Sequence, residues 1–236
     1  MLVGNKNYKM LLLNLGRYSV DKICTLPWMS IETTPLGEFR PCCLAEESIL
    51  DKNQRPYDIA KGDSINDVFH SDYMNNLRQE FLDDKMPKTC AKCWSLESAG
   101  GTSKRMISNE KFGLNTNKLD IKFLDLKLGN ICNLKCVTCT PNNSTQILAE
   151  RFKFDEKVDA EYTRKYITEV VAKQAPKKID FIKTTLANAK FDKLRFDILG
   201  GEPLINPAIF EFMDWLSEQP YAPQTTVALT TNGTTY

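Results

Sequence analysis

The sequence predicts an α/β protein in which strand–helix units build a parallel sheet, preceded by a small α+β module rich in cysteine. Strand-like and helical segments alternate after a polar, turn-rich break at residues 113–117, and such alternation produces parallel sheets. Before the break, two strand-like segments flank a turn and predict a β-hairpin. The cysteines are the third observation, since they lie in groups: Cys24, Cys42, Cys43, Cys90, Cys93, Cys132, Cys136 and Cys139.

Length and composition fit a globular chain. The 236 residues can form one large domain or two small ones. Apolar residues make up 42% and charged residues 26%, which argues against disorder. Lys and Arg (31) nearly balance Asp and Glu (30), so the charge does not indicate a nucleic-acid or anionic-membrane surface. No apolar run approaches the ~20 residues of a membrane-spanning helix, and no signal-peptide cleavage site is evident, so we expect a cytoplasmic protein.

The predicted N-terminal module covers residues 1–115. Its hairpin pairs 28–32 with 38–42 across a turn that contains Pro35 and Gly37. A helix is expected from Ser64, three residues before an Asp that replaces the usual Glu or Gln of a capping box. Apolar residues follow at helical spacing, which we interpret as core packing: Tyr73, Leu77 and Phe81.

The predicted parallel sheet occupies residues 116–236. Residues 121–128 alternate with period two and form its first strand. A helical region follows through 143–190, with interruptions expected near Asp155 and Pro176. The remaining elements are a strand at 194–199, a helix at 207–217 and a strand at 226–231. Ligands bind such sheets at the carboxyl ends of the strands, so functional residues are expected there.

The cysteine content favours a soft-metal or iron–sulfur protein. A chain of this size does not need disulfides, and no export signal directs it to an oxidising compartment. His70 is the only histidine, which nearly excludes sites with two or three His ligands and most His-assisted nucleophiles. Buried structural thiols would explain isolated cysteines but not tight groups.

Three cysteines follow the first predicted strand of the sheet. Cys132, Cys136 and Cys139 have the spacing C-x3-C-x2-C, with no fourth Cys or His close by in sequence. A structural zinc site requires four ligands, whereas three thiolates on a four-iron cluster leave one iron open to a substrate or cofactor. The count of three is therefore the informative feature.

Two further motifs end the second and third predicted strands. The second ends in Gly200-Gly201-Glu202-Pro203 and the third in Thr230-Thr231-Asn232-Gly233. With CNLKCVTC after the first strand, this chain resembles radical S-adenosylmethionine (SAM) enzymes, whose cluster loop, GGEP motif and TNG motif occur in the same order. A tight turn without a ligand is the alternative for the two glycines.

The resemblance implies a fold and a chemistry. Residues 116–236 would form the first half, three βα units, of the family's partial (β/α)6 barrel. Cys132, Cys136 and Cys139 would hold a [4Fe-4S] cluster whose free iron binds SAM. Reductive cleavage of SAM would give a 5′-deoxyadenosyl radical that abstracts hydrogen from the substrate. The implied SAM-binding residues are Gly200, Gly201, Glu202, Pro203 and Asn232. Of these, Gly200, Gly201 and Glu202 would contact the methionyl ammonium.

The N-terminal cysteines are similar to a second module of these enzymes. Cys24 is followed by Gly37 and Cys42, and later by a C-x2-C pair. With the stretches LPW at 26–28 and PCC at 41–43, this pattern resembles the twitch module, the short form of the SPASM domain, which holds an auxiliary [4Fe-4S] cluster. Zinc stays open as the occupant, since four converging thiolates suit either. The implied ligands are Cys24, Cys42, Cys90 and Cys93, with Cys43 as a spare buried thiol.

Two features depart from the family pattern. The twitch-like module precedes the barrel, as in radical SAM proteins carried by some phages and bacteria. The family's barrel has six strand–helix units, whereas this sequence stops after the third strand, before the usual ribose and adenine contacts. We therefore expect a fragment of a longer protein, or a barrel completed by a partner, with an unpaired sheet edge and poor SAM cleavage on its own.

The sequence thus predicts a radical SAM enzyme that acts on a peptide or a small molecule, with an auxiliary cluster assisting oxidation. An electron donor such as a flavodoxin or ferredoxin is the expected partner, and neither nucleic acid nor a membrane is. Two alternatives stay open. One is a non-enzymatic interaction module stabilised by zinc or a cluster, and the other is an iron–sulfur electron-transfer fragment that does not bind SAM.

Overall fold

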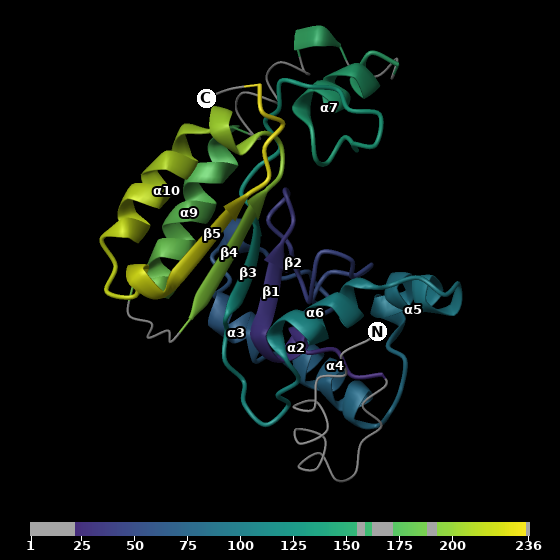
Figure 1. The fold of residues 1–236 in the computed structure, drawn as a ribbon. Coiled ribbons are helices and arrows are strands. Elements are labelled where there is room, and N and C mark those ends of the chain that lie inside the picture. Colours follow the sequence, from purple (N-terminus) through teal and green to yellow (C-terminus); the bar gives the residue numbers. More distant parts are fainter. Residues whose placement is uncertain (1–21, 155–158, 162–171, 188–192, 235–236) are drawn as a thin grey trace, which may run out of the picture.

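The computed structural model describes residues 22–154, 159–161, 172–187 and 193–234 (Figure 1). It is a mixed α/β structure built on one five-stranded sheet, in the order β2-β1-β3-β4-β5. β1 and β2 pair antiparallel, and the other three neighbouring pairs are parallel. The α/β class is confirmed for the described residues. The strands are β1 (Ser30–Thr33), β2 (Phe39–Arg40), β3 (Phe123–Lys127), β4 (Leu194–Leu199) and β5 (Thr225–Leu229).

The N-terminal hairpin continues the parallel sheet. The hairpin itself is confirmed, with Glu32 of β1 opposite Arg40 of β2. On its other side β1 pairs parallel with β3, for example Ile31 with Leu124. Because β1 covers β3, the edge strand of the parallel part is β5 among the described residues. The sheet therefore crosses the division expected at residue 115, and that division stays a prediction.

The helices of the N-terminal half differ from expectation in two places. Residues 28 and 29 lie in a helix rather than a strand, because Pro27 occupies its first turn, where a missing N–H costs little. The helix expected from Ser64 begins there but ends at Phe69, since the side chain of Ser71 caps a second helix. The helices are α2 (Leu26–Met29), α3 (Ile65–Phe69), α4 (Asp72–Leu82), α5 (Ala91–Ser98) and α6 (Lys104–Phe112), with short 3₁₀ turns at Ile59–Lys61 and Lys88–Cys90.

The C-terminal helices follow the predicted alternation. α9 runs through Pro176, so the interruption predicted there is wrong; buried Ile179 and Ile182 hold the helix in place by packing. The interruption predicted near Asp155 lies outside the described residues. None of the described helices has the length and apolar character needed to cross a bilayer. The helices are α7 (Thr145–Phe152), α9 (Ala172–Leu186) and α10 (Pro207–Ser217), with 3₁₀ turns at Pro203–Ile205 and Ala222–Gln224.

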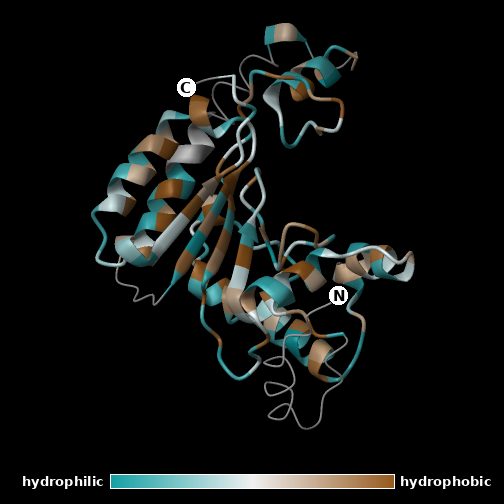
Figure 2. Ribbon diagram, in the orientation of Figure 1, coloured by the Kyte–Doolittle hydropathy of each residue, from teal (hydrophilic) through white to brown (hydrophobic). Residues whose placement is uncertain are grey.

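The two faces of the sheet have different characters. α9 and α10 cover one face (Figure 1), where Phe196 of β4 meets Phe212 of α10 edge to face at 5.6 Å. The residues of β3 and β4 on this face are buried and apolar (Leu124, Leu126, Phe196 and Ile198), and these strands carry brown segments in Figure 2. Over the opposite face lies α6, whose Phe112 stacks on Phe123 of β3 at 5.7 Å. The buried core therefore includes the layer between the sheet and α9–α10, and it continues among the N-terminal helices, where Phe81 of α4 contacts Trp28 of α2 and Trp94 of α5.

Candidate functional site

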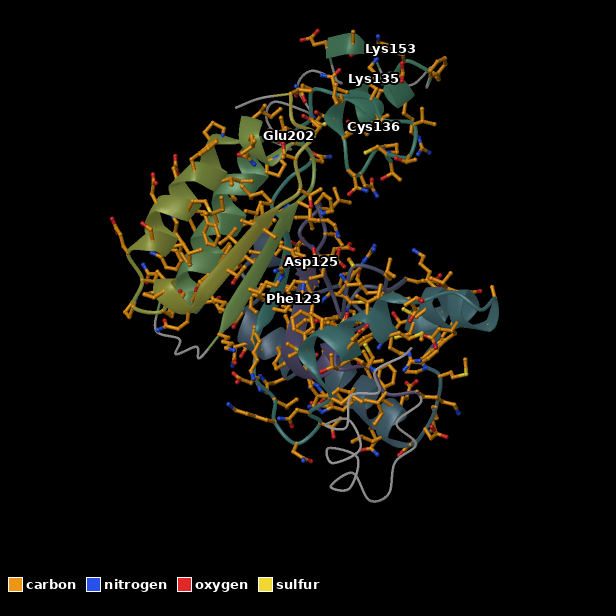
Figure 3. The ribbon with its side chains drawn as sticks, viewed as in Figure 1. Phe123, Asp125, Lys135, Cys136, Lys153 and Glu202 are labelled. Atoms are coloured by element: carbon orange, nitrogen blue, oxygen red, sulfur yellow. The ribbon has the colours of Figure 1, made fainter. Side chains whose placement is uncertain are left out.

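Three loops meet at one edge of the sheet. β3 leads into the loop with Cys132, Cys136 and Cys139, which we call the cysteine loop. β4 leads into residues 200–203 and β5 into residues 230–233. Figure 3 shows Glu202 and Cys136 at this edge, with Asp125 further down β3. Parallel strands bring their carboxyl ends together in this way, so the three motifs are neighbours.

Gly200 and Gly201 pack against the backbone ahead of Cys132. Both have a positive backbone φ, +93° for Gly200 and +63° for Gly201. Residues other than glycine rarely adopt this backbone conformation. A Cβ on Gly200 would lie 2.6 Å from the carbonyl oxygen of Gly129. A Cβ on Gly201 would lie 2.8 Å from the carbonyl carbon of Ile131. The close approach of the two loops therefore requires glycine at both positions.

Backbone hydrogen bonds fix this contact. The N–H of Glu202 donates to the carbonyl of Ile131 at 2.7 Å, and the N–H of Gly201 donates to the carbonyl of Asn143 at 3.2 Å. The cysteine loop is also tied to the start of α7. There the hydroxyl of Thr145 accepts from the N–H of Cys132 at 3.2 Å. These bonds hold the backbone at Cys132 between β4 and α7.

Glu202 joins the ends of β4 and β5. Its carboxylate is 1% exposed and accepts from the N–H of Leu204 at 2.9 Å, the hydroxyl of Thr231 at 2.8 Å and the N–H of Asn232 at 2.6 Å. Burial alone would raise the pKa of this carboxyl, but the hydrogen bonds from Asn232, Leu204 and Thr231 outweigh it and lower the pKa below its ordinary value. Sequence reasoning missed this bracing role. The contact with a methionyl ammonium stays a prediction.

The three thiols of the cysteine loop lie close in sequence but differ in exposure. Cys136 is exposed, whereas Cys132 and Cys139 are half-buried. The Cys132 sulfur accepts from the N–H of Leu134 at 3.5 Å, and the side-chain amide of Asn232 lies 4.0 Å from it. Asn232 and Cys132, two of the predicted site residues, are therefore neighbours across the β3 and β5 loops.

The four cysteines predicted for the auxiliary site come from three separate segments. Cys24 precedes α2, Cys42 follows β2, and Cys90 and Cys93 lie at the start of α5. The pKa of Cys24 and of Cys42 is raised to about 12, mainly by burial, and neighbouring thiols contribute: Cys90 and Cys93 at Cys24, and Cys24 at Cys42. Burial, Cys42 and Cys93 likewise raise the pKa of Cys90. The fold thus brings the four thiols within electrostatic range of one another.

The chemistry of this donor set suits a metal or an iron–sulfur cluster. Buried thiols that disfavour one another's ionised form become ligands when a metal supplies the positive charge. All eight cysteines are free of disulfides. Within the described residues, however, no three His, Cys, Asp or Glu side chains are arranged so that they could hold a metal ion. The assignment of metal ligands at both groups of cysteines therefore stays a prediction.

Cys43, the predicted spare thiol, follows Cys42 directly and is half-buried. Its pKa is raised, mainly by burial and then by the charge of Asp125 on β3, whereas the charge of Lys104 on α6 lowers it. Asp125 is itself buried, and burial raises its pKa to about 6, against the opposing effect of Lys104. Asp125 lies between Glu32 and Asp197 in the sheet register, on the face opposite α9 and α10. A row of buried and half-buried acidic groups thus crosses the polar face of the sheet.

Comparison with known proteins addresses the N-terminal half. The model of a family described as SPASM, an iron–sulfur cluster-binding domain, matches residues 24–94. Searches among curated proteins and among solved structures found no match. The matched segment contains Cys24, Cys42, Cys90 and Cys93, the residues predicted as auxiliary ligands, and ends before the cysteine loop. Residues 24–94 are therefore similar to an iron–sulfur cluster-binding domain, as the sequence predicts.

Proposed function

We propose that this protein is a radical SAM enzyme whose N-terminal module holds an auxiliary [4Fe-4S] cluster. The SPASM match supports iron–sulfur binding at residues 24–94, and this domain is usually found in radical SAM enzymes. One observation carries the SAM-binding half of the proposal. Gly200 and Gly201 pack on the backbone ahead of Cys132, and Asn232 lies beside its thiol. The three family-like motifs therefore lie next to one another, which supports a single site built from all three.

In this proposal Cys132, Cys136 and Cys139 hold a second cluster with one iron open to SAM. When bound, the cluster and SAM supply the one-electron chemistry that generates a radical. The chain's own residues position them. The glycines allow the β4 loop to reach the cysteine loop, and Glu202 braces the β4 and β5 loops against each other. Its lowered pKa keeps Glu202 anionic at neutral pH, which favours a nearby ammonium group.

The proposal also covers the barrel, the substrate and the source of electrons. The parallel strands β3, β4 and β5 are the start of the family's barrel, and the polar face that carries Asp125 is its interior. A peptide or small molecule would bind against this face, and a flavodoxin or ferredoxin would deliver the electron. The auxiliary cluster, on the module at residues 1–115, would accept or relay the substrate's electron.

Iron content tests the proposal. Anaerobically reconstituted protein is expected to hold about eight irons per chain, as two four-iron clusters. Replacing Cys132, Cys136 and Cys139 together with alanine should remove roughly half of the iron, whereas Cys43→Ala should remove none. Stoichiometric zinc with half the iron or less in the parent chain would refute the auxiliary cluster. Full iron retention by the triple variant would refute the cluster at the cysteine loop.

A further inference from the structure

Helix α6 lies beyond the segment that matches SPASM, yet its Asn109 holds the backbone on both sides of Cys24. The side-chain oxygen of Asn109 accepts from the N–H of Thr25 at 2.8 Å. Its amide nitrogen donates to the carbonyl of Ile23 at 2.7 Å. Asn109 is 7% exposed, so water does not compete for these bonds. The two bonds together fix the peptide units that flank the Cys24 thiol.

Arg105, one turn earlier on α6, connects Cys24 to the helix that carries Cys93. Its guanidinium donates to the carbonyl of Ile23 at 3.0 Å and forms a two-bond pair with Glu97 at 2.9 and 2.6 Å. Glu97 lies on α5, one turn after Cys93. The pair is mostly shielded from solvent, with side-chain exposures of 9% for Arg105 and 19% for Glu97. A two-bond guanidinium–carboxylate pair fixes orientation as well as distance.

α6 is itself anchored to the sheet. Phe112 stacks on Phe123 at 5.7 Å, and the ammonium of Lys104 lies 5.6 Å from the centre of the Phe123 ring. Figure 1 shows α6 between the sheet and α5. Phe112 comes seven residues after Arg105, so the two side chains lie on nearly the same side of α6. The side chains that hold Ile23 and Thr25 therefore project from a fixed support.

We propose that Asn109 and Arg105 are positioning residues of the auxiliary metal site. They set the distance and direction of Cys24 relative to α5, so the functional unit extends to α6 instead of ending at residue 94. This positioning role rests on the proposed function, because it takes Cys24 and Cys93 as ligands of the same auxiliary cluster. Hydrogen bonds behind a metal ligand orient it, and their loss typically lowers metal affinity about 10–100-fold.

The test uses the full chain with Cys132, Cys136 and Cys139 replaced by alanine, so that iron reports on the auxiliary site alone. In this background Asn109→Ala is compared with Glu110→Ala, an exposed neighbour on α6. Iron release to a ferrous chelator is expected to be about tenfold faster in Asn109→Ala and to change less than twofold in Glu110→Ala. Asn109→Asp keeps the acceptor for the N–H of Thr25, so its release rate should fall between those of parent and Asn109→Ala.

A spectroscopic signature separates positioning from folding. The g-values of the reduced auxiliary cluster should shift in Asn109→Asp and stay unchanged in Glu110→Ala. Should Asn109→Ala fail to fold, Arg105→Lys replaces it, because lysine keeps the charge but loses the two-bond pair, and faster iron release is again expected. Equal release rates and g-values in all folded variants of an iron-binding parent overturn this proposal alone. A parent background that binds no iron overturns the auxiliary cluster, and the positioning role with it.

Discussion

Replacing Gly201 with alanine tests whether the β4 loop must touch the cysteine loop. A Cβ on Gly201 would lie 2.8 Å from the carbonyl carbons of Asn130 and Ile131. Nonbonded carbon atoms approach to about 3.5–4.0 Å, so the two loops would have to separate by about 1 Å. That separation breaks the 2.7 Å hydrogen bond from the N–H of Glu202 to the carbonyl of Ile131.

The magnitude follows from three contributions. Alanine in the left-handed region costs about 1–2 kcal/mol. A lost backbone hydrogen bond costs about 0.5–1.5 kcal/mol. Strain from overpacking costs about 1–3 kcal/mol. The last two overlap, since the separation that relieves the strain also breaks the bond, so we expect a loss of about 3–4 kcal/mol in the free energy of unfolding.

Gly233→Ala is the matched control. Gly233 lies at the same edge of the sheet with φ +69°, but a Cβ there meets nothing within 4 Å. The control should therefore lose only the conformational cost of about 1–2 kcal/mol. Urea unfolding of the metal-free, reduced proteins, followed by far-UV circular dichroism, measures both. Equal losses for the two variants would refute the close packing of the β4 loop on the cysteine loop.

Two further substitutions test the brace and the core. Glu202→Gln points an amide at the N–H of Asn232 and should cost about 1–3 kcal/mol in urea unfolding at pH 7. Folding lowers the pKa of Glu202, so the carboxylate contributes fully to the free energy of unfolding above its ordinary pKa of 4.5, and this contribution is lost as the pH falls below that value. The difference in unfolding free energy between Glu202→Gln and the parent should therefore shrink at acidic pH. A pH-independent difference would contradict the bracing role. Phe212→Ala removes the contact with Phe196 and should lower the free energy of unfolding, measured by thermal unfolding, by about 3–5 kcal/mol. The control Phe210→Ala replaces a half-exposed side chain and should lower it by about 1 kcal/mol or less. Equal losses would contradict the packing of α10 on β4.

Local signals in the sequence predicted many of the elements. β4 and α10 have the bounds expected from their periodicity and from Pro207. The start of the helix at Ser64 follows from its capping hydroxyl. The placement of the three motifs at one edge follows from parallel topology alone, since each comes directly after a strand. These features depend on neighbouring residues, which sequence patterns report.

Contacts between distant segments were not predictable in this way. Nothing in the hairpin indicates that Ser30 of β1 pairs with Phe123 of β3, because both edges of β1 have the same donors and acceptors. Nor does the sequence around Asn109 indicate that its amide brackets Cys24, since an Asn within a helix is usually exposed. The role of Glu202 at Asn232 is of the same kind, because it depends on how two loops meet.

The response of the cysteine loop to SAM tests the central claim most directly. A cluster held by Cys132, Cys136 and Cys139 has an open iron, whereas one held by four thiolates has none. Adding SAM to the reconstituted, dithionite-reduced protein should therefore change the EPR signal of the cysteine-loop cluster and leave the auxiliary signal as it was. The variant with these three cysteines replaced by alanine should show no response. An unchanged spectrum in a chain that carries both clusters, or the same response in the triple variant, would contradict the account.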